Sequence, residues 1–498
     1  MSEQEKVENT SFQREISLAV RNAAKLMASF VVTFGVAFVV RFWIPRFLGP
    51  EDFGRLHFSE QFAMTLFFIV TFGTDVYIRK EVAQRPDHAS DFFGGLLLFR
   101  LCLSALVGVI IAVALSQMNK EPIVWRLVYT FSLGQMLFVF NTTLGAVLEA
   151  RGTISALAMV NAVVKVLWGI GCAGGLLMGM GPMAIAVSFL IGEMLKVPVL
   201  YSAARRNVGL RMEFHMAGFK AIIIASLPYC LNYVALGIYS KIGVTVLSAL
   251  TNDKEVGWFG AATNITFIIF LFIPILRSIL MPMGARLAKE STDMVNKTLL
   301  ATTRIMLMVT VPIAVMLSLN ASFIIEKIYT DSFLPASASL RIISPLVPIS
   351  FLCTISGVYL IQVGNIWRVA RISIIALLFN IGLNAILIAP IHRYFGDGGG
   401  GIATAIAVVI TESLVVTLYF LIIRKRILTG GRPIAWLVFR LILSCGVLTG
   451  IHQFIGGKGF ITIFIEILAY IIIGLIAGVL PINELKKAIS SLSSRSKL

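Results

Sequence analysis

The chain has 498 residues, of which 58% are hydrophobic and only 13% charged, and its mean hydropathy is +0.90. Soluble globular chains are about 45 to 50% apolar and about 25% charged, so this composition excludes a soluble enzyme, a disordered protein and a disulfide scaffold. The net charge of +17 would suit nucleic-acid binding, but most cations lie in short loops between apolar segments, where membrane topology already requires them.

Long apolar stretches follow one another along almost the whole chain. A membrane-spanning helix needs about 20 mostly apolar residues, and such stretches run from about residue 26 to residue 480. We therefore predict an all-α integral membrane protein with about 14 transmembrane helices. In chain order, the predicted spans cover residues 26–46, 57–78, 91–117, 124–148, 155–178, 183–203, 221–240, 257–282, 303–322, 337–362, 372–390, 401–422, 433–453 and 460–480.

The distribution of charge predicts the orientation of these spans. If both termini are cytoplasmic, most of the 42 Lys and Arg residues fall in cytoplasmic segments, as the positive-inside rule expects. The segment 1–25 contains no apolar run, so we expect no cleavable signal peptide, and the first span would serve as the insertion signal. These features predict a multi-pass protein of a bacterial or archaeal cytoplasmic membrane.

A weak internal repeat divides the spans into two groups. The connection after the first span, Leu48-Gly49-Pro50-Glu51-Asp52-Phe53-Gly54, is partly repeated in Asp253-Lys254-Glu255-Val256-Gly257. Both segments place an acid and then a glycine before a long apolar helix, which favours two related lobes, an arrangement common among secondary transporters. The predicted parts are a cytoplasmic segment 1–25, an N-lobe 26–203, a cytoplasmic connection 204–220, a C-lobe 221–422, two further spans in 433–480 and a cytoplasmic tail 481–498.

Sequence motifs for catalysis, nucleotides and metals are missing. The chain has no Walker A sequence, no HExxH and no GxSxG, and its connections are short. The five cysteines all lie in predicted spans, and the five histidines lack ligand spacing. We therefore expect no catalytic residues, no metal and no cofactor, and transport by conformational change is the function class that remains.

Several segments carry a family resemblance. After the Leu-Gly-x-x-x-x-Gly turn that begins at Leu48, the run Phe72-Gly73-Thr74-Asp75 precedes a basic end of the second span, Arg79-Lys80. The segment Met281-Pro282-Met283-Gly284-Ala285-Arg286 closes the eighth span. With the number of spans and the loop lengths, these segments resemble the oligosaccharide flippase (Wzx-like) branch of the multidrug/oligosaccharidyl-lipid/polysaccharide exporter superfamily.

The resemblance implies a fold of two pseudo-symmetric six-helix lobes around a central cavity, with spans 13 and 14 appended. It also implies a mechanism and a substrate. Its members move an oligosaccharide on a polyprenyl pyrophosphate from the cytoplasmic to the outer leaflet by alternating access, without ATP hydrolysis. Expected partners are this lipid-linked substrate, membrane lipids and other membrane proteins of polysaccharide assembly, with no nucleic acid. The resemblance leaves open whether H⁺ or Na⁺ serves as a coupling ion.

Cations inside apolar spans are the candidates for substrate binding. A buried cation is costly unless it is paired or hydrated, and a pyrophosphate needs such cations. Arg41 and Arg277 lie in spans 1 and 8, which face the cavity in the resembling family, and Arg100 and Lys165 lie well inside spans 3 and 5. We predict that these four side chains bind the substrate.

Other polar groups in the spans have alternative interpretations, as ion-binding or coupling groups or as structural contacts. Asp75 would either bind a coupling ion or pair with an Arg from span 1 or 3. Glu193 and Lys196 are three residues apart on span 6 and would neutralise each other on one helix face. A hard-cation site would take oxygen ligands from Asn232, Asn380, Asn384 and Thr404, although it lacks a carboxylate, and hydrogen bonding between helices is the alternative.

Two alternative functions stay open at this point. A cation-coupled multidrug exporter of the same superfamily would favour acids and aromatic residues in its cavity, whereas these spans carry more bases. A membrane glycan polymerase or ligase would need a large outer loop with charged residues, which the chain lacks.

Overall fold

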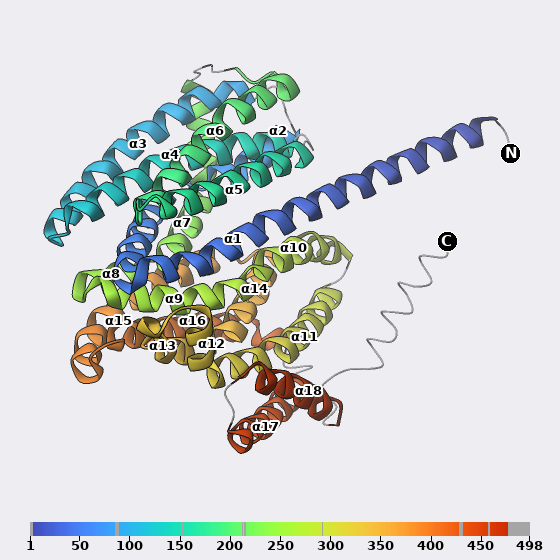
Figure 1. Cartoon of the computed structure of the whole chain (residues 1–498). Helices are drawn as coiled ribbons and strands as arrows, with labels where there is room; N and C mark the ends of the chain where they lie inside the picture. Colours follow the sequence, from blue (N-terminus) through green and yellow to red (C-terminus); the bar gives the residue numbers. More distant parts are fainter. Residues whose placement is uncertain are drawn as a thin grey trace. The chain divides into compact units, whose positions relative to one another are not determined.

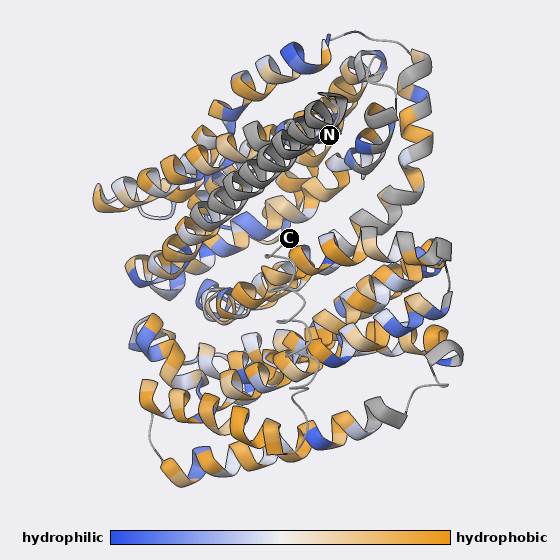
Figure 2. Cartoon of the chain, turned by 90° about the vertical axis from the view of Figure 1, so that its right-hand side faces the viewer, coloured by the Kyte–Doolittle hydropathy of each residue, from blue (hydrophilic) through white to orange (hydrophobic). Residues whose placement is uncertain are grey.

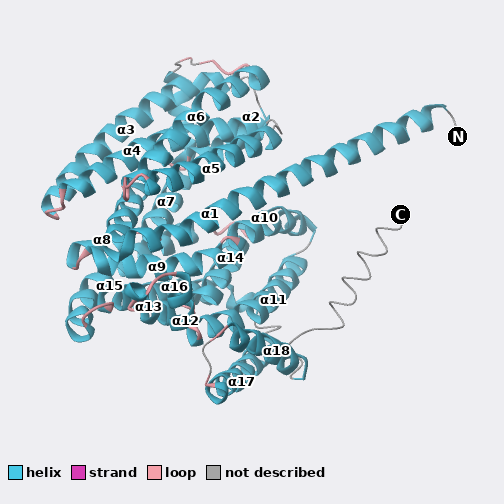
Figure 3. Cartoon of the chain, viewed as in Figure 1, coloured by secondary structure: helices cyan, strands magenta, loops and turns pink. Residues whose placement is uncertain are grey.

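The computed structural model describes residues 3–84, 89–150, 154–211, 213, 216–290, 292–427, 432–456 and 459–476. Within these ranges every regular element is a helix, and none is a strand (Figure 3). The all-α membrane fold that the composition predicts is confirmed.

The membrane spans correspond closely to the predicted ones. Among the described residues, 10 helices are long and apolar enough to cross a membrane. These helices contain the predicted spans 3 to 6 and 8 to 13. Span 1 lies in α1 (Glu3–Thr71), span 7 lies in α7 (Met216–Tyr239), and residues 460–476 of span 14 form the shorter apolar helix α18 (Phe460–Ile476). The predicted span 2 begins in α1 but is interrupted at Phe72 and Gly73, and its last residues belong to α2 (Thr74–Gln84).

The chain forms two compact units, Met1–Gly257 and Trp258–Leu498. The division falls inside α9 (Asp253–Phe270) rather than in a loop. The lobe boundaries predicted from the sequence remain a prediction, because compactness alone does not identify lobes that move.

The first unit is built around α1. Its further helices are α2 (Thr74–Gln84), α3 (Ala89–Gln117), α4 (Pro122–Ala150), α5 (Ile154–Leu177), α6 (Met183–Val208), α7, α8 (Ile242–Leu250) and the start of α9. Helix α4 packs on α6 and α1, and α5 packs on the same two helices (Figure 1). At one end, an apolar core contains Ile78, Phe93, Leu96, Leu148 and Leu200.

A sharp bend divides α1 into two arms. Gly49 has φ 71° and ψ 173°, a conformation that residues with a Cβ rarely adopt, and Pro50 follows it. Because proline disfavours helical geometry in the residue before it, the Gly-Pro pair turns the chain between predicted spans 1 and 2. Side chains before and after the bend are thereby brought close together.

The second unit contains the remaining helices. They are α10 (Phe272–Glu290), α11 (Thr292–Leu319), α12 (Ala321–Ile328), the 3-10 helix η2 (Asp331–Phe333), α13 (Ala336–Ile343), α14 (Leu346–Gln362), α15 (Ile366–Phe395), α16 (Gly399–Ile427), α17 (Arg432–Ile455) and α18. Helices α15 and α16 pack together, α14 packs on α11 and α16, and α17 packs on α11 and α18.

The outer surface is apolar, whereas several buried side chains are polar. Figure 2 shows hydrophobic residues along most of the length of the helices, and Ile170 and Ile442 are 64% and 67% exposed. Buried polar side chains include Gln61, Asn141 and Asn380. This distribution is expected in a bilayer, where lipid covers apolar side chains and polar groups bind one another inside the protein.

Candidate functional site

The bend of α1 brings two opposite charges together. Arg41 lies before Gly49 and Glu60 lies after it, and Arg41 Nη2 is 3.9 Å from Glu60 Oε1. Both side chains are 33% exposed. This pair is therefore accessible while lying between apolar helices.

Lysines from α5 and α6 lie beside this pair. The Lys165 ammonium interacts electrostatically with Arg41, Glu60 and Lys196, and it stands 3.4 Å from the centre of the Trp168 ring, a favourable cation–π position. Lys196 Nζ is 2.7 Å from Glu193 Oε1.

Glu193 is anchored from α4 as well as by Lys196. Asn141 Nδ2 donates hydrogen bonds to the Glu193 side chain at 2.8 Å and to its backbone oxygen at 2.9 Å. The carboxylate is thus fixed between α4 and α6. The ion pair that the sequence analysis considered for Glu193 and Lys196 is present in the structure.

The turn between α7 and α8 adds a further cation. Lys241 interacts with the charges of Glu60 and Arg41, and the buried His57 interacts with those of Lys241 and Arg41. We call the set Arg41, Lys165, Lys196, Lys241, Glu60 and Glu193 the cationic cluster. Its four cations outnumber its two carboxylates.

Sequence reasoning found only part of the cationic cluster. Lys241 directly follows the predicted span 7, residues 221–240, and neither it nor Glu60 or His57 was among the candidates. Glu60, Met64 and Phe68 are four residues apart and therefore lie on one face of α1. No local pattern in the sequence shows that this face meets Arg41. The bend at Gly49 brings them together.

Arg100 is a helix-joining residue rather than a free cation. Its guanidinium, on α3, donates hydrogen bonds to the Thr71 and Val139 backbone oxygens at 3.1 and 3.0 Å, and to the hydroxyls of Thr74 and Thr143. It also forms an ion pair with Asp75 at 3.0 Å. This is one of the roles that the sequence analysis allowed for Asp75. The geometry favours a structural role for Arg100 over substrate binding.

The second unit holds Arg277, the other predicted substrate residue. Arg277 lies exposed on α10, and its charge acts on Cys353 of α14 and Tyr419 of α16. The Cys353 thiol lies within hydrogen-bonding reach of Glu412 on α16. Arg277 is therefore placed near an acid of its own unit.

The candidate oxygen ligands for a cation are only partly assembled. Asn384 Nδ2 donates to the backbone and side-chain oxygens of Asn380, at 2.8 and 3.0 Å, and Asn380 Nδ2 donates to Thr411 at 3.2 Å. The Thr404 hydroxyl donates to the Gly400 oxygen within its own helix. Asn232 belongs to the first unit, and its side chain lies outside the described residues.

A second charged cluster surrounds Arg55, just after the bend of α1. Its guanidinium is within 3.3 Å of carboxylate oxygens of Glu51, Asp52, Glu121 and Asp253. Partial burial alone would lower the pKa of Arg55, but the hydrogen bond to Asp52 and the other three acids outweigh it and raise that pKa. Arg55 therefore stays charged and ties α1 to the start of α9.

The start of α9 also touches α1 through its backbone. A Cβ on Gly54 would overlap the Asp253 carbonyl, and a Cβ on Gly257 would overlap the Pro50 carbonyl. The two segments that the sequence analysis identified as a weak repeat therefore pack against each other in a reciprocal manner. Glycine is required at both positions because the neighbouring atoms belong to backbone.

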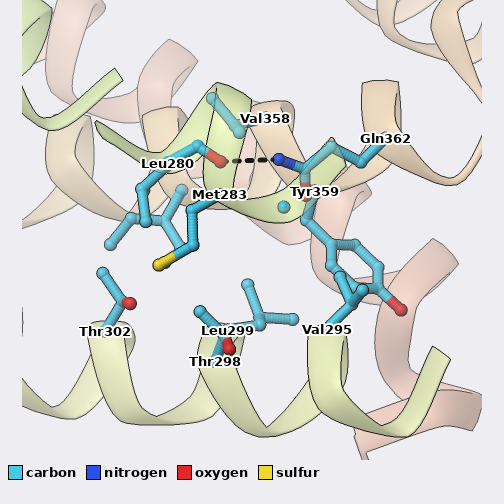
Figure 4. Close-up of a pocket in the computed structure, with 11 residues that line it drawn as sticks. Leu280, Met283, Val295, Thr298, Leu299, Thr302, Val358, Tyr359 and Gln362 are labelled. Atoms are coloured by element: carbon cyan, nitrogen blue, oxygen red, sulfur yellow. Dashed lines mark hydrogen bonds between the residues drawn. The ribbon is translucent and has the colours of Figure 1, made fainter. Parts of the chain in front are cut away.

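A small cavity lies between α10, α11 and α14 of the second unit (Figure 4). The space between its lining side chains, part of which is open to the surroundings, measures about 300 Å³, and Figure 4 shows Gln362 reaching towards Leu280. Gln362 Nε2 donates to the Leu280 oxygen at 2.8 Å, and Tyr359 Oη donates to Asn296 at 2.6 Å. These bonds fix α14 to its neighbours, and the cavity is too small for a glycan.

We predict a modest destabilisation when Gly284 in this cavity is replaced by alanine. The new Cβ would overlap the Gln362 amide, which must then rotate and lose its bond to Leu280, a cost of about 1 kcal/mol. Denaturant unfolding of the detergent-solubilised protein measures the loss. In a Gln362→Ala background the same change should cost almost nothing, and an equal cost in both backgrounds would show that Gln362 is not the obstacle.

These features define a class of protein. Among the described residues, no group of three or more His, Cys, Asp or Glu side chains is arranged to hold a metal. Many membrane spans in two compact units, with an accessible cationic cluster among the spans, are typical of a secondary transporter.

A family model for a polysaccharide biosynthesis protein matches residues 19–288, and one for MatE matches residues 228–386. The chain belongs to the polysaccharide biosynthesis protein family.

Solved structures agree with this assignment of the fold. The lipid II flippase MurJ, in an inward closed conformation, is similar with a TM-score of 0.68 and 15% identity, over 91% of this chain and 98% of that chain. An inward-facing multidrug resistance MATE family transporter gives 0.63 and 15%, over 82% and 98%. A mutant of the Vibrio cholerae MATE transporter VcmN gives 0.54 and 14%, also over 82% and 98%.

No curated protein matches the sequence. The solved structures that share its fold are named as a flippase and as transporters. The chain is a multi-pass membrane protein with this fold, which weighs against the polymerase or ligase alternative.

Proposed function

We propose that the protein is a flippase that moves a polyprenyl-pyrophosphate-linked oligosaccharide across the cytoplasmic membrane by alternating access, without ATP hydrolysis. The observation that carries this proposal is the cationic cluster on α1, α5, α6 and the turn between α7 and α8. The match to the polysaccharide biosynthesis family supports it.

The charges of the cationic cluster suit a pyrophosphate. Such a head group brings several negative charges into an apolar region, where they need cationic hydrogen-bond donors. Glu60 and Glu193 compensate part of the positive charge while the site is empty. An arriving pyrophosphate would compete with these carboxylates for Arg41, Lys165 and Lys196. Binding and release then remain in balance, as a transporter requires.

We expect Arg41→Ala to lower the initial rate of substrate translocation by at least about tenfold, which corresponds to about 1.4 kcal/mol of lost interaction. The assay uses proteoliposomes loaded with a defined polyprenyl-pyrophosphate oligosaccharide. Lys165→Ala should act in the same direction, because its ammonium lies in the same cluster.

Arg126→Ala is the matched control, because Arg126 is an exposed arginine of the same unit, outside the cluster. It should translocate at the wild-type rate. If well-folded Arg41→Ala and Lys165→Ala proteins flip as fast as the control, the cationic cluster does not bind the substrate, and the proposal fails.

A second candidate function is the export of small drugs coupled to a cation. The MatE match to residues 228–386 favours it, and so does the pair of buried asparagines, Asn380 and Asn384. Efflux of a cationic dye that depends on a Na⁺ or H⁺ gradient, with no flipping of any glycan lipid tested, would replace the flippase proposal with this one.

The proposal also includes location and partners. Both termini would lie in the cytoplasm of a bacterial or archaeal cell, as the positive charge of the loops predicts. The partners would be the lipid-linked oligosaccharide, membrane lipids and the membrane proteins that make or polymerise it. Labelling of single cysteines added at each terminus, in intact and in permeabilised cells, tests the orientation.

A further inference from the structure

A buried acid joins the last two helices to the rest of the second unit. On α18, Glu466 is fully buried, and its two carboxylate oxygens have different partners. Oε1 lies 2.6 Å from His452 Nδ1 of α17, and Oε2 accepts a hydrogen bond of 2.8 Å from Asn320, which follows α11. Three parts of the chain therefore meet at one carboxyl group.

The inward face of α18 is unusual for a helix of this composition. Its buried residues are Thr462, Glu466, Tyr470 and Gly474, spaced four apart, whereas most of the others are apolar and exposed. Tyr470 Oη also donates to the Met308 oxygen of α11 at 2.6 Å. Figure 1 shows α17 and α18 as a hairpin beside α11. Polar contacts, not apolar packing alone, hold this hairpin in place.

The net charge of the group formed by Glu466, His452 and Asn320 depends on one proton. With a neutral His452 that donates from Nδ1, the group carries one buried negative charge. When a proton is added at Nε2, the imidazolium and the carboxylate together have no net charge. The His452 side chain is 21% exposed, while Glu466 is fully buried, so the imidazole provides the path between water and the acid. Neutralising a buried charge stabilises the arrangement.

The charged side chains on the adjoining elements of the described chain mostly have partners of their own. Asn320, His452 and Glu466 contact one another, and the exposed Glu326 and Lys327 of α12 pair with each other. On α17, Arg440 lies about three turns before His452 and stacks over Trp436. The remaining charged residues on these helices and on α13 are Arg304, the exposed pair Asp293 and Lys297, and Arg341, which donates to Ser322.

We propose that Glu466, His452 and Asn320 form a proton-binding site that fastens the α17–α18 hairpin to α11. A proton taken from water binds His452 Nε2 and neutralises the group, and its release leaves a buried negative charge that weakens the contact. The site is independent of the transported substrate, and its test does not depend on the proposed function.

The test is infrared difference spectroscopy of the purified full-length protein in lipid nanodiscs, comparing weakly acidic with weakly alkaline buffer. The difference spectrum of the wild type should contain a component from the imidazole and the carboxylate. The spectrum of Glu466→Gln should lack this component. Glu326→Gln, which removes an exposed acid of the same region, should retain it. Thermal unfolding adds a second measurement, since the wild type should lose stability as the pH rises, whereas Glu466→Gln, without the carboxylate that pairs with the protonated imidazole, should not.

If Glu466→Gln fails to fold, His452→Gln is measured in its place. Its amide can still donate to the carboxylate but cannot take up a proton, so the imidazole component should disappear and the pH dependence of unfolding should flatten. A wild-type spectrum that Glu466→Gln and His452→Gln leave unchanged would overturn the proposal. So would an equal loss in Glu326→Gln.

Discussion

Arg100→Met is expected to lower the free energy of unfolding by about 3 to 5 kcal/mol, the range found when one partner of a buried ion pair is removed. The Arg100 side chain is only 6% exposed and joins three other helices, α1, α2 and α4, through its guanidinium. Methionine preserves much of the volume, so the loss reflects the missing hydrogen bonds and the stranded Asp75 carboxylate. Denaturant unfolding in mild detergent measures it.

A double variant separates the ion pair from the remaining bonds of Arg100. In Arg100→Met with Asp75→Asn, no charge is left unpaired, so part of the lost stability should return. Arg126→Met provides the exposed control and should stay close to the wild type. If Arg100→Met unfolds within about 1 kcal/mol of the wild type, the guanidinium is not holding the helices together, and its assignment as a substrate residue would regain support.

The membrane fold was predictable because the bilayer imposes a simple rule on composition. Each span must be long and apolar, so the spans can be recognised without knowledge of their neighbours. The Gly49-Pro50 pair likewise marks the turn between the first two spans, since both residues limit the backbone locally. The division into compact units at Gly257, inside a continuous helix, has no such local signal.

The candidate site was predictable only as a list of charged residues. A buried cation signals a polar role, but the sequence does not show what lies opposite it. Arg100 and Arg41 look alike in sequence, yet threonines from three other helices surround Arg100, whereas Arg41 lies in the accessible cationic cluster, 3.9 Å from the Glu60 carboxylate. Glu466 lies within the predicted span 14, but the sequence does not show that it meets His452 of the preceding helix and Asn320, which is 146 residues away.

Gly257→Ala is expected to disrupt the first unit, with a large loss of folded protein. The new methyl group would overlap the Pro50 carbonyl, and a Cβ at Gly54 would overlap the Asp253 carbonyl in the same way. Neither obstacle can rotate away, because both atoms are backbone, unlike the Gln362 amide beside Gly284. The two helices would have to separate, and the ion pairs of Arg55 and Lys120 with Asp253 would lengthen as well.

Gly35→Ala is the matched control, because Gly35 lies on the same helix as Gly54 and a Cβ there meets open space. It should fold at least as well as the wild type, since alanine favours a helix over glycine by about 1 kcal/mol. Fluorescence-detected gel filtration in detergent gives the fraction of folded protein. Gly257→Ala and Gly54→Ala proteins that elute and melt like Gly35→Ala would mean that α9 does not lie against α1, and the reciprocal packing of the repeated segments would be wrong. Loss in both, with Gly35→Ala intact, would show that the repeat is retained because two backbones meet there.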